Sequence, residues 1–182
     1  GFLNSQTLSI TSGTGNDWYL WILAKDNVGN TTIATTNPFW LDNTKPIIGG
    51  MTSKPSSAST YTLTMTGIAD NQDIEVQSGV QGYYISTSST APTEASTWVP
   101  ITDSTVTYDD ETGTYTVTYE GALELTSSYF WVIDNVGNIS QVSSLTTKEI
   151  FYSINDTSWY ETFADAVADV AISGDTIKVL KN

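Results

Sequence analysis

The chain of 182 residues contains no cysteine and no histidine, and its six basic residues are all lysines, so arginine is absent as well. Without histidine there is no Ser-His pair for nucleophilic catalysis and no imidazole that exchanges protons near neutral pH. Without cysteine there is no thiolate nucleophile and no disulfide, and zinc sites built from thiolate or imidazole ligands are excluded. The chemistry that remains is that of carboxylates and of hard cations bound through oxygen.

Positive charge and long apolar runs are also scarce. Twenty acidic residues against six lysines give a formal net charge of −14, which disfavours contact with nucleic acid and with anionic membranes. No run approaches the ~18 apolar residues that a membrane-spanning helix requires, so we expect no membrane insertion. The first four residues lack the basic and apolar regions of a signal peptide, which indicates either a protein that is not exported or a piece of a longer chain.

Threonine, serine and aromatic residues are abundant. The chain contains 30 Thr and 21 Ser, 12% of its residues are aromatic and only 14% are charged. Threonine and aromatic side chains favour pleated, half-buried strands over helices. The composition therefore predicts a folded, mainly β protein.

One pentapeptide, Asp-Asn-Val-Gly-Asn, occurs twice. The copies are Asp26–Asn30 and Asp134–Asn138, which lie 108 residues apart, and each follows an aromatic-rich segment. Asp and Asn bond to the backbone of a turn and Gly supplies a positive φ, so each copy is predicted to connect two strands of a hairpin. The interval is close to the ~100 residues of one immunoglobulin-type β-sandwich, which indicates consecutive modules.

Short segments of alternating apolar and polar residues fill the interval between the copies. We count seven or eight such strands, which predicts an immunoglobulin-like β-sandwich in tandem. Residues 44–148 are expected to form one complete sandwich, after a polar link that ends at Pro46. Residues 1–43 are expected to hold only the C-terminal strands of a preceding domain, so that the chain begins inside that domain.

Residues 149–182 change from a strand-like to a helix-like pattern. Ser158 and Glu161 form a capping-box pattern, and apolar residues such as Phe163 and Val167 follow at helical spacing. A strand is expected over Thr176–Leu180. We expect a short strand-helix-strand segment that opens a further module.

Three motifs occur in an order that resembles the bacterial Ig-like repeats of large extracellular or cell-wall-attached proteins. They are the aromatic strand that ends in Asp-x-x-Gly-Asn, the segment Ser78–Ser86 with its Ser-Gly-Val start, and an Asp-x-Thr-x-Pro link at Asp42–Pro46. The resemblance covers residues 1–148. The segment 159–180 is similar to the entry cap of right-handed parallel β-helix regions in such proteins.

The resemblance implies a non-enzymatic structural or adhesive spacer in a bacterial cell-surface or secreted multidomain protein. The partners would be other domains of the same chain, with host or cell-wall glycan or protein as possible contacts, and the location would be extracellular. The alternative is a carbohydrate-binding module accessory to a secreted glycan-degrading enzyme. A third interpretation takes the tail as the start of a β-helix lyase.

No cofactor is expected. Calcium is the one candidate, because Asp and Asn near the domain junction offer hard oxygen ligands. The residues considered are Asp26, Asn30, Asp42 and Asn43, together with the acidic run 70–73. The competing interpretation is that these are ordinary turn residues that bond to their own backbone. No stretch has the spacing of a twelve-residue calcium loop.

Tryptophans provide the candidate contact surface. If Phe130 and Val132 face the core, Trp131 faces the other way because strand side chains alternate, and Trp21 matches it in the first copy. These two residues and Trp98 could bind sugar or protein, or a neighbouring loop could cover them. The adjacent carboxylates of Asp109–Glu111 resemble a glycosidase pair only in composition, since a hairpin tip provides no cleft between them.

Overall fold

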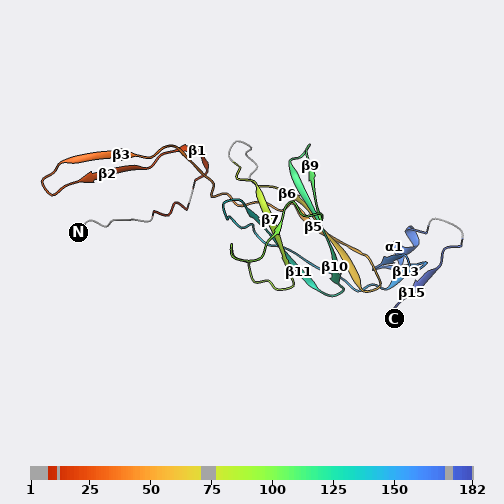
Figure 1. The fold of residues 1–182 in the computed structure, drawn as a ribbon. Helices are drawn as coiled ribbons and strands as arrows, with labels where there is room; N and C mark the ends of the chain where they lie inside the picture. The colour runs from red at the N-terminus through yellow and green to blue at the C-terminus, as the bar shows by residue number, and fades with distance from the viewer. Residues whose placement is uncertain (1–7, 12, 71–76, 171–173, 182) are drawn as a thin grey trace.

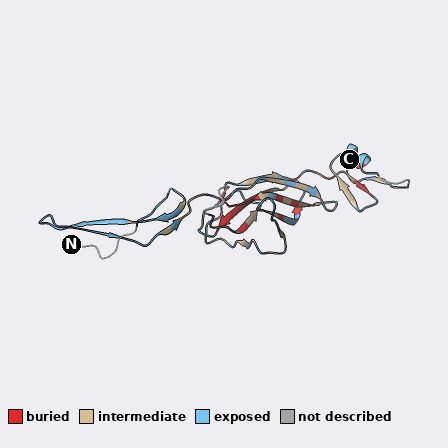
Figure 2. Cartoon of the chain, turned by 90° about the horizontal axis from the view of Figure 1, so that it is seen from above, coloured by how far each residue is buried: buried red, intermediate tan, exposed pale blue. Residues whose placement is uncertain are grey.

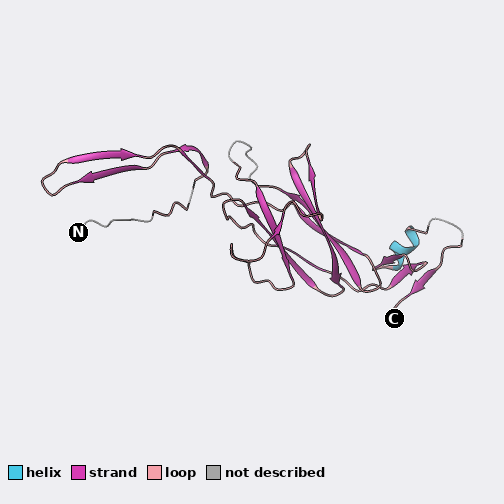
Figure 3. Cartoon of the chain, in the orientation of Figure 1, coloured by secondary structure: helices cyan, strands magenta, loops and turns pink. Residues whose placement is uncertain are grey.

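The computed structural model describes residues 8–11, 13–70, 77–170 and 174–181. Three parts follow one another along the chain: a long hairpin, a central pair of sheets and a small C-terminal segment (Figure 1). The described residues are mainly β, as the composition predicts (Figure 3). Among them, no helix has the length and apolar character that crossing a membrane requires.

The central part consists of two antiparallel four-stranded sheets. The strands of the first sheet, in spatial order, are β5 (Gly50–Pro55), β6 (Thr60–Ile68), β10 (Thr114–Leu123) and β9 (Val106–Asp109). Those of the second are β12 (Ser143–Thr146), β11 (Ser127–Asp134), β7 (Val80–Ser86) and β8 (Val99–Pro100). Eight strands thus form a sandwich-like, two-layer arrangement, within the seven or eight predicted.

The core lies between these sheets (Figure 2). Tyr61, Leu63 and Met65 alternate with threonines along β6 and are fully buried. Phe130 and Val132 of β11 meet them from the opposite sheet, in one cluster of buried residues. The alternation read from the sequence therefore identifies the inward faces of both strands correctly, because neighbouring side chains of a strand point to opposite faces.

The outer face of β11 is covered, which agrees with the second of the two interpretations given for Trp131. Trp131 is only 3% exposed, so it is not available as a contact surface. Its ring lies 6.1 Å from that of Tyr84, which in turn lies 5.8 Å from the ring of Trp98. Trp98 belongs to the segment between β7 and β8, and its indole N–H donates to the carbonyl of Thr93. Aromatic packing against this segment buries a face that alternation alone would leave in solvent.

The N-terminal part is thin. Strands β2 (Trp21–Lys25) and β3 (Thr31–Thr35) form a two-stranded sheet in which every residue is exposed. Strands β1 (Gly15–Trp18) and β4 (Phe39–Leu41) form a second short sheet between this hairpin and the central sheets. In Figure 2 the hairpin extends away from the central part, and none of its residues is coloured as buried.

The C-terminal part contains more strand than the sequence predicts. Strands β13 (Tyr152–Ile154), β14 (Ser158–Tyr160) and β15 (Ile177–Val179) form one antiparallel sheet, and helix α1 (Phe163–Ala168) lies between β14 and β15 in the chain. The predicted helix start at Ser158 is wrong. Ser158 pairs with Ile154 in the sheet, and the N-cap is Thr162, whose hydroxyl accepts the N–H of Asp165.

The C-terminal part is joined to the sandwich by apolar and polar contacts. Ile150 is fully buried in the main core, against which Trp159 and Leu180 also pack. The hydroxyl of Tyr61 lies 3.0 Å from a carboxylate oxygen of Glu161, and burial followed by this contact raises the pKa of Tyr61. These contacts bring the C-terminal sheet against one end of the sandwich.

Candidate metal centre

The second copy of the repeated pentapeptide forms a tight turn at the end of β11. Asp134 Oδ1 accepts the N–H groups of Val136 and Asn138 at 3.0 and 2.8 Å, and its Oδ2 accepts the Asn138 side-chain amide at 2.7 Å. Gly137 has a φ of 97°, a conformation that glycine adopts without strain. These contacts fix the position of the Asp134 carboxylate, which is fully buried.

Asp70 approaches the same point from the end of β6. Asp70 is 3% exposed, and its Oδ2 accepts hydrogen bonds from the Ser78 hydroxyl at 3.2 Å and the Gly79 N–H at 2.5 Å. Its other oxygen, Oδ1, is buried and has no hydrogen-bond partner among the described residues. A buried carboxylate oxygen without a partner is costly, because water that solvates it in the unfolded chain is lost.

Asp42 arrives from the link that precedes the sandwich. Its carboxylate accepts the N–H of Thr44 at 2.9 Å and that of Ser78 at 3.3 Å, and its carbonyl accepts the side-chain amide of Asn138 at 3.1 Å. The link is thus bonded both to the segment that precedes β7 and to the turn that follows β11. Asp42 is half-buried.

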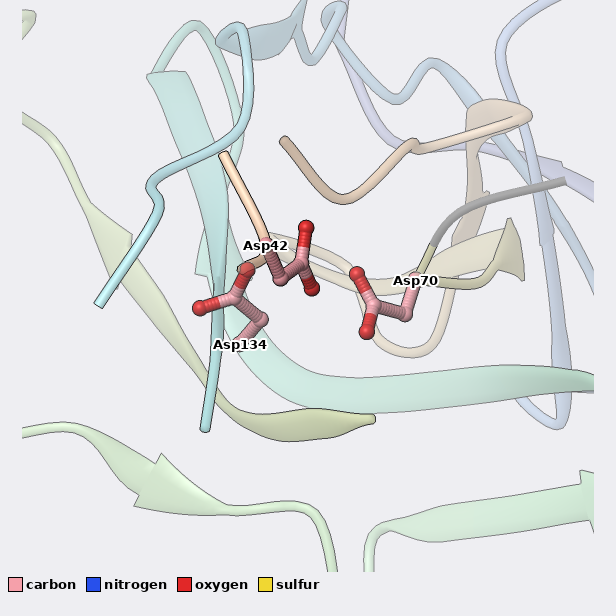
Figure 4. A group of neighbouring side chains, drawn as sticks. All are labelled: Asp42, Asp70 and Asp134. Atoms are coloured by element: carbon pink, nitrogen blue, oxygen red, sulfur yellow. The ribbon is translucent and has the colours of Figure 1, made fainter. Parts of the chain in front are cut away.

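The three carboxylates face one another (Figure 4), with one oxygen from each within 4.8 Å of the other two. No lysine in the described part of the chain forms an ion pair with any of them. At this separation two like charges repel by roughly 3 kcal/mol at an effective dielectric constant of about 20. Burial, reinforced by the charge of Asp70, accordingly raises the pKa of Asp134 despite the hydrogen bonds that oppose the shift.

The structure brings one of the four sequence-predicted calcium ligands, Asp42, into this cluster. Asp26 and Asn30 lie in the exposed turn between β2 and β3, where the Asn30 amide and backbone N–H groups bond to the Asp26 carboxylate. These bonds lower the pKa of Asp26. The Asn43 side chain donates instead to the carbonyl of Gly13 at 2.9 Å.

Sequence reasoning did not select Asp134, although a signal for it existed. Asp134 holds the same place in the second pentapeptide as Asp26 does in the first, and only the second copy lies at the end of the sandwich. Asp70 was included in the acidic run 70–73, of which residues 71–73 lie outside the described residues.

The other candidate residues lie apart from the cluster. Trp21 is 67% exposed on β2, whereas Trp98 is half-buried and Trp131 is buried. The carboxylate of Asp109 accepts the N–H groups of Glu111 and Thr112 within its own turn, as expected of a hairpin tip. Hydrogen bonding from the Thr112 side chain, followed by these two backbone bonds, lowers the pKa of Asp109.

Two of the hollows on the described surface lie elsewhere. One, of about 200 Å³, lies between the ends of the sheets, near Ile85, Leu123 and Ser128. The other, of about 320 Å³, lies where the C-terminal part meets β5 and is lined by Lys54, Tyr160 and other residues. Neither adjoins the carboxylate cluster.

Comparison of the chain with protein-family models, curated proteins and solved structures finds no match.

Proposed function

We propose that this chain is a non-enzymatic structural or adhesive spacer segment of a bacterial cell-surface or secreted multidomain protein. The observation that carries the proposal is the repeated hairpin. The turns at Asp26 and Asp134 have the same three hydrogen bonds to the aspartate carboxylate, with lengths that agree within 0.1 Å. Two copies of one strand-turn-strand unit at a domain-sized interval are typical of modules in tandem.

The order of the strands supports an immunoglobulin-like module. In constant-type immunoglobulin domains the first, second, fifth and fourth strands form one sheet, and the third, sixth and seventh form the other. If β8 is taken as an additional strand beside β7, the two central sheets have this order. We therefore assign residues 44–148 to one complete Ig-like sandwich.

The exposed hairpin supports a second module before it. Within the sandwich, β11 pairs with β7 on the edge opposite β12, and the facing sheet covers Phe130. Strand β2 has neither among the described residues, and its apolar side chains Ile22 and Leu23 are exposed. By analogy with β11, residues 1–43 are the last strands of a preceding Ig-like domain.

A pulling experiment tests the spacer proposal. The whole chain, placed between two modules of known mechanical behaviour, should give one discrete unfolding event for residues 44–148. The unfolded segment should have a length of roughly 350 Å, at about 3.4 Å for each residue of that range, and the gain is this length less the distance between the ends of the folded sandwich. Extension without a discrete event would show that the sandwich does not bear load, and would contradict the proposal.

Carbohydrate binding is the second candidate function, because the N-terminal part exposes several aromatic side chains. Trp21 and Trp40 are 67% and 72% exposed, and a flat aromatic face can stack on a sugar ring. A glycan array should then show binding that Trp21→Ala abolishes. Trp98→Ala serves as the comparison from the sandwich. Absence of glycan binding by the unmodified chain would leave the spacer as the sole proposal.

A further inference from the structure

We propose that Asp42, Asp70 and Asp134 bind one Ca²⁺ ion at the point where the link enters the sandwich. This site goes beyond the spacer function and does not depend on it. It joins three segments that are remote in sequence: the link before the sandwich, the end of β6 and the end of β11.

The spacing of the carboxylates fits a single calcium ion. Calcium binds oxygen at about 2.3–2.6 Å, so two of its ligands can be no more than roughly 5 Å apart. One oxygen from each of Asp42, Asp70 and Asp134 lies within 4.8 Å of the other two. Three oxygens at these separations lie within about 2.8 Å of a common point (4.8 Å divided by √3), so small rotations of the side chains suffice to place all three on one ion.

The unpartnered oxygen of Asp70 is an independent indication of a ligand. Asp70 is only 3% exposed, and its Oδ1 has no hydrogen-bond partner among the described residues. Figure 4 shows the Asp70 carboxylate directed towards Asp42. Buried polar atoms in folded proteins are almost always satisfied, and a cation bound by the cluster would supply the missing partner.

The donor set favours calcium over other cations. The three ligands are hard carboxylate oxygens, and the chain has no histidine or cysteine to provide the nitrogen or sulfur that zinc prefers. Backbone N–H groups already hold Asp42 and Asp134 in place. Calcium accepts such irregular, partly preset geometries, whereas magnesium requires a near-octahedral set and retains its water molecules.

A bound ion would fasten the link to the sandwich. Of the three ligands, only Asp42 precedes the sandwich. Asp42 is bonded to the sandwich through the backbone N–H of Ser78 and the side-chain amide of Asn138. Calcium would add a contact that also neutralises the mutual repulsion of the carboxylates. The expected effect is a more stable sandwich with a less mobile link.

Titration calorimetry with calcium chloride, on the full chain stripped with EDTA, tests the site. We expect binding of one ion, and a melting temperature in millimolar calcium that is roughly 5 °C or more above that in EDTA. Asp70→Asn and Asp42→Asn should each weaken binding at least tenfold. Asp26→Asn is the matched control, because Asp26 makes the same turn contacts away from the cluster, and it should bind calcium as the unmodified chain does.

The variants also separate loss of the site from loss of the fold. Asp70→Asn removes a buried, repelled charge, so its melting temperature in EDTA should not fall below that of the unmodified chain. Should this variant fail to fold, Asp42→Asn alters only the half-buried link and answers the same question. Absence of binding by the unmodified chain, equal weakening by Asp26→Asn, or equal stabilisation by magnesium chloride would overturn the proposal while leaving the spacer function untouched.

Discussion

The hairpins β2–β3 and β11–β12 have the same turn but opposite surroundings. In both, the glycine of the turn has a φ near 97–98°, and the aspartate carboxylate accepts the same three hydrogen bonds. Yet Ile22 of β2 is exposed, whereas Phe130, at the corresponding position of β11, is fully buried between two sheets. The first hairpin lacks a covering sheet among the described residues, and the second has one.

This difference separates local from tertiary contributions to structure. The turn forms in either setting because its contacts are made within five residues. Stability of the strands depends on burial instead, since an isolated two-stranded hairpin is marginal in water. Substitutions at matched positions should therefore affect the two hairpins very differently.

The largest difference is expected in the core. Phe130→Ala should lower the free energy of unfolding of the sandwich by about 3–5 kcal/mol, because it leaves a cavity between the two sheets. Ile22→Ala, the matched variant, should change it by less than about 0.5 kcal/mol. Urea unfolding followed by tryptophan fluorescence measures both. A comparable loss in the two variants would mean that β2 is buried in solution.

A smaller difference is expected from the second asparagine of each turn. The Asn138 amide donates to the carboxylate of Asp134 and to the carbonyl of Asp42, in a partly buried site. Asn138→Ala should therefore lower the free energy of unfolding by about 1–3 kcal/mol. Asn30→Ala should leave the midpoint unchanged, since its bond to Asp26 is exposed. Equal midpoints for the two variants in urea would contradict a junction role for Asn138.

Much of the fold follows from patterns that act over a few residues. Alternation in β6 and β11 identifies the side chains that meet in the core, and the pentapeptide identifies both turns. The helix start is assigned wrongly in this way, because the capping pattern at Ser158 does not begin the helix and the N-cap is Thr162. Ser158 pairs with Ile154 in the C-terminal sheet, a sheet contact that the local pattern does not encode.

The carboxylate cluster depends on contacts that no local pattern encodes. Asp42, Asp70 and Asp134 are brought together only when the link, β6 and β11 have taken their places. The same limit applies to Trp131, whose outward direction follows from alternation but whose burial follows from packing with Tyr84 and its neighbours. The sequence points to Asp42 through its position in the link and to Asp70 through the acidic run 70–73, but not to Asp134 and not to the fact that the three meet.

The finest comparison concerns the two turn aspartates themselves. Hydrogen bonds, first among them that from the Asn30 side chain, lower the pKa of exposed Asp26. At Asp134 the same bonds are outweighed by burial, which raises the pKa. Carbon-13 NMR titration of the two carboxyl groups in EDTA should therefore place Asp26 below, and Asp134 above, the ordinary aspartate pKa.

These opposite shifts have opposite consequences for stability. The raised pKa of Asp134 means that the folded state holds this proton more tightly than the unfolded state does. Its unfavourable contribution is therefore complete above the folded pKa and is relieved as the pH falls through that value. For Asp26 the sign is reversed: its favourable contribution is present above the unfolded pKa and is lost as the pH falls through the folded one. Asn30→Ala should move the pKa of Asp26 back towards its ordinary value, while Asn138→Ala should move that of Asp134 further from it. In the unmodified chain, a pKa displaced from the ordinary aspartate value in the same direction at both positions would show that burial does not distinguish the two turns.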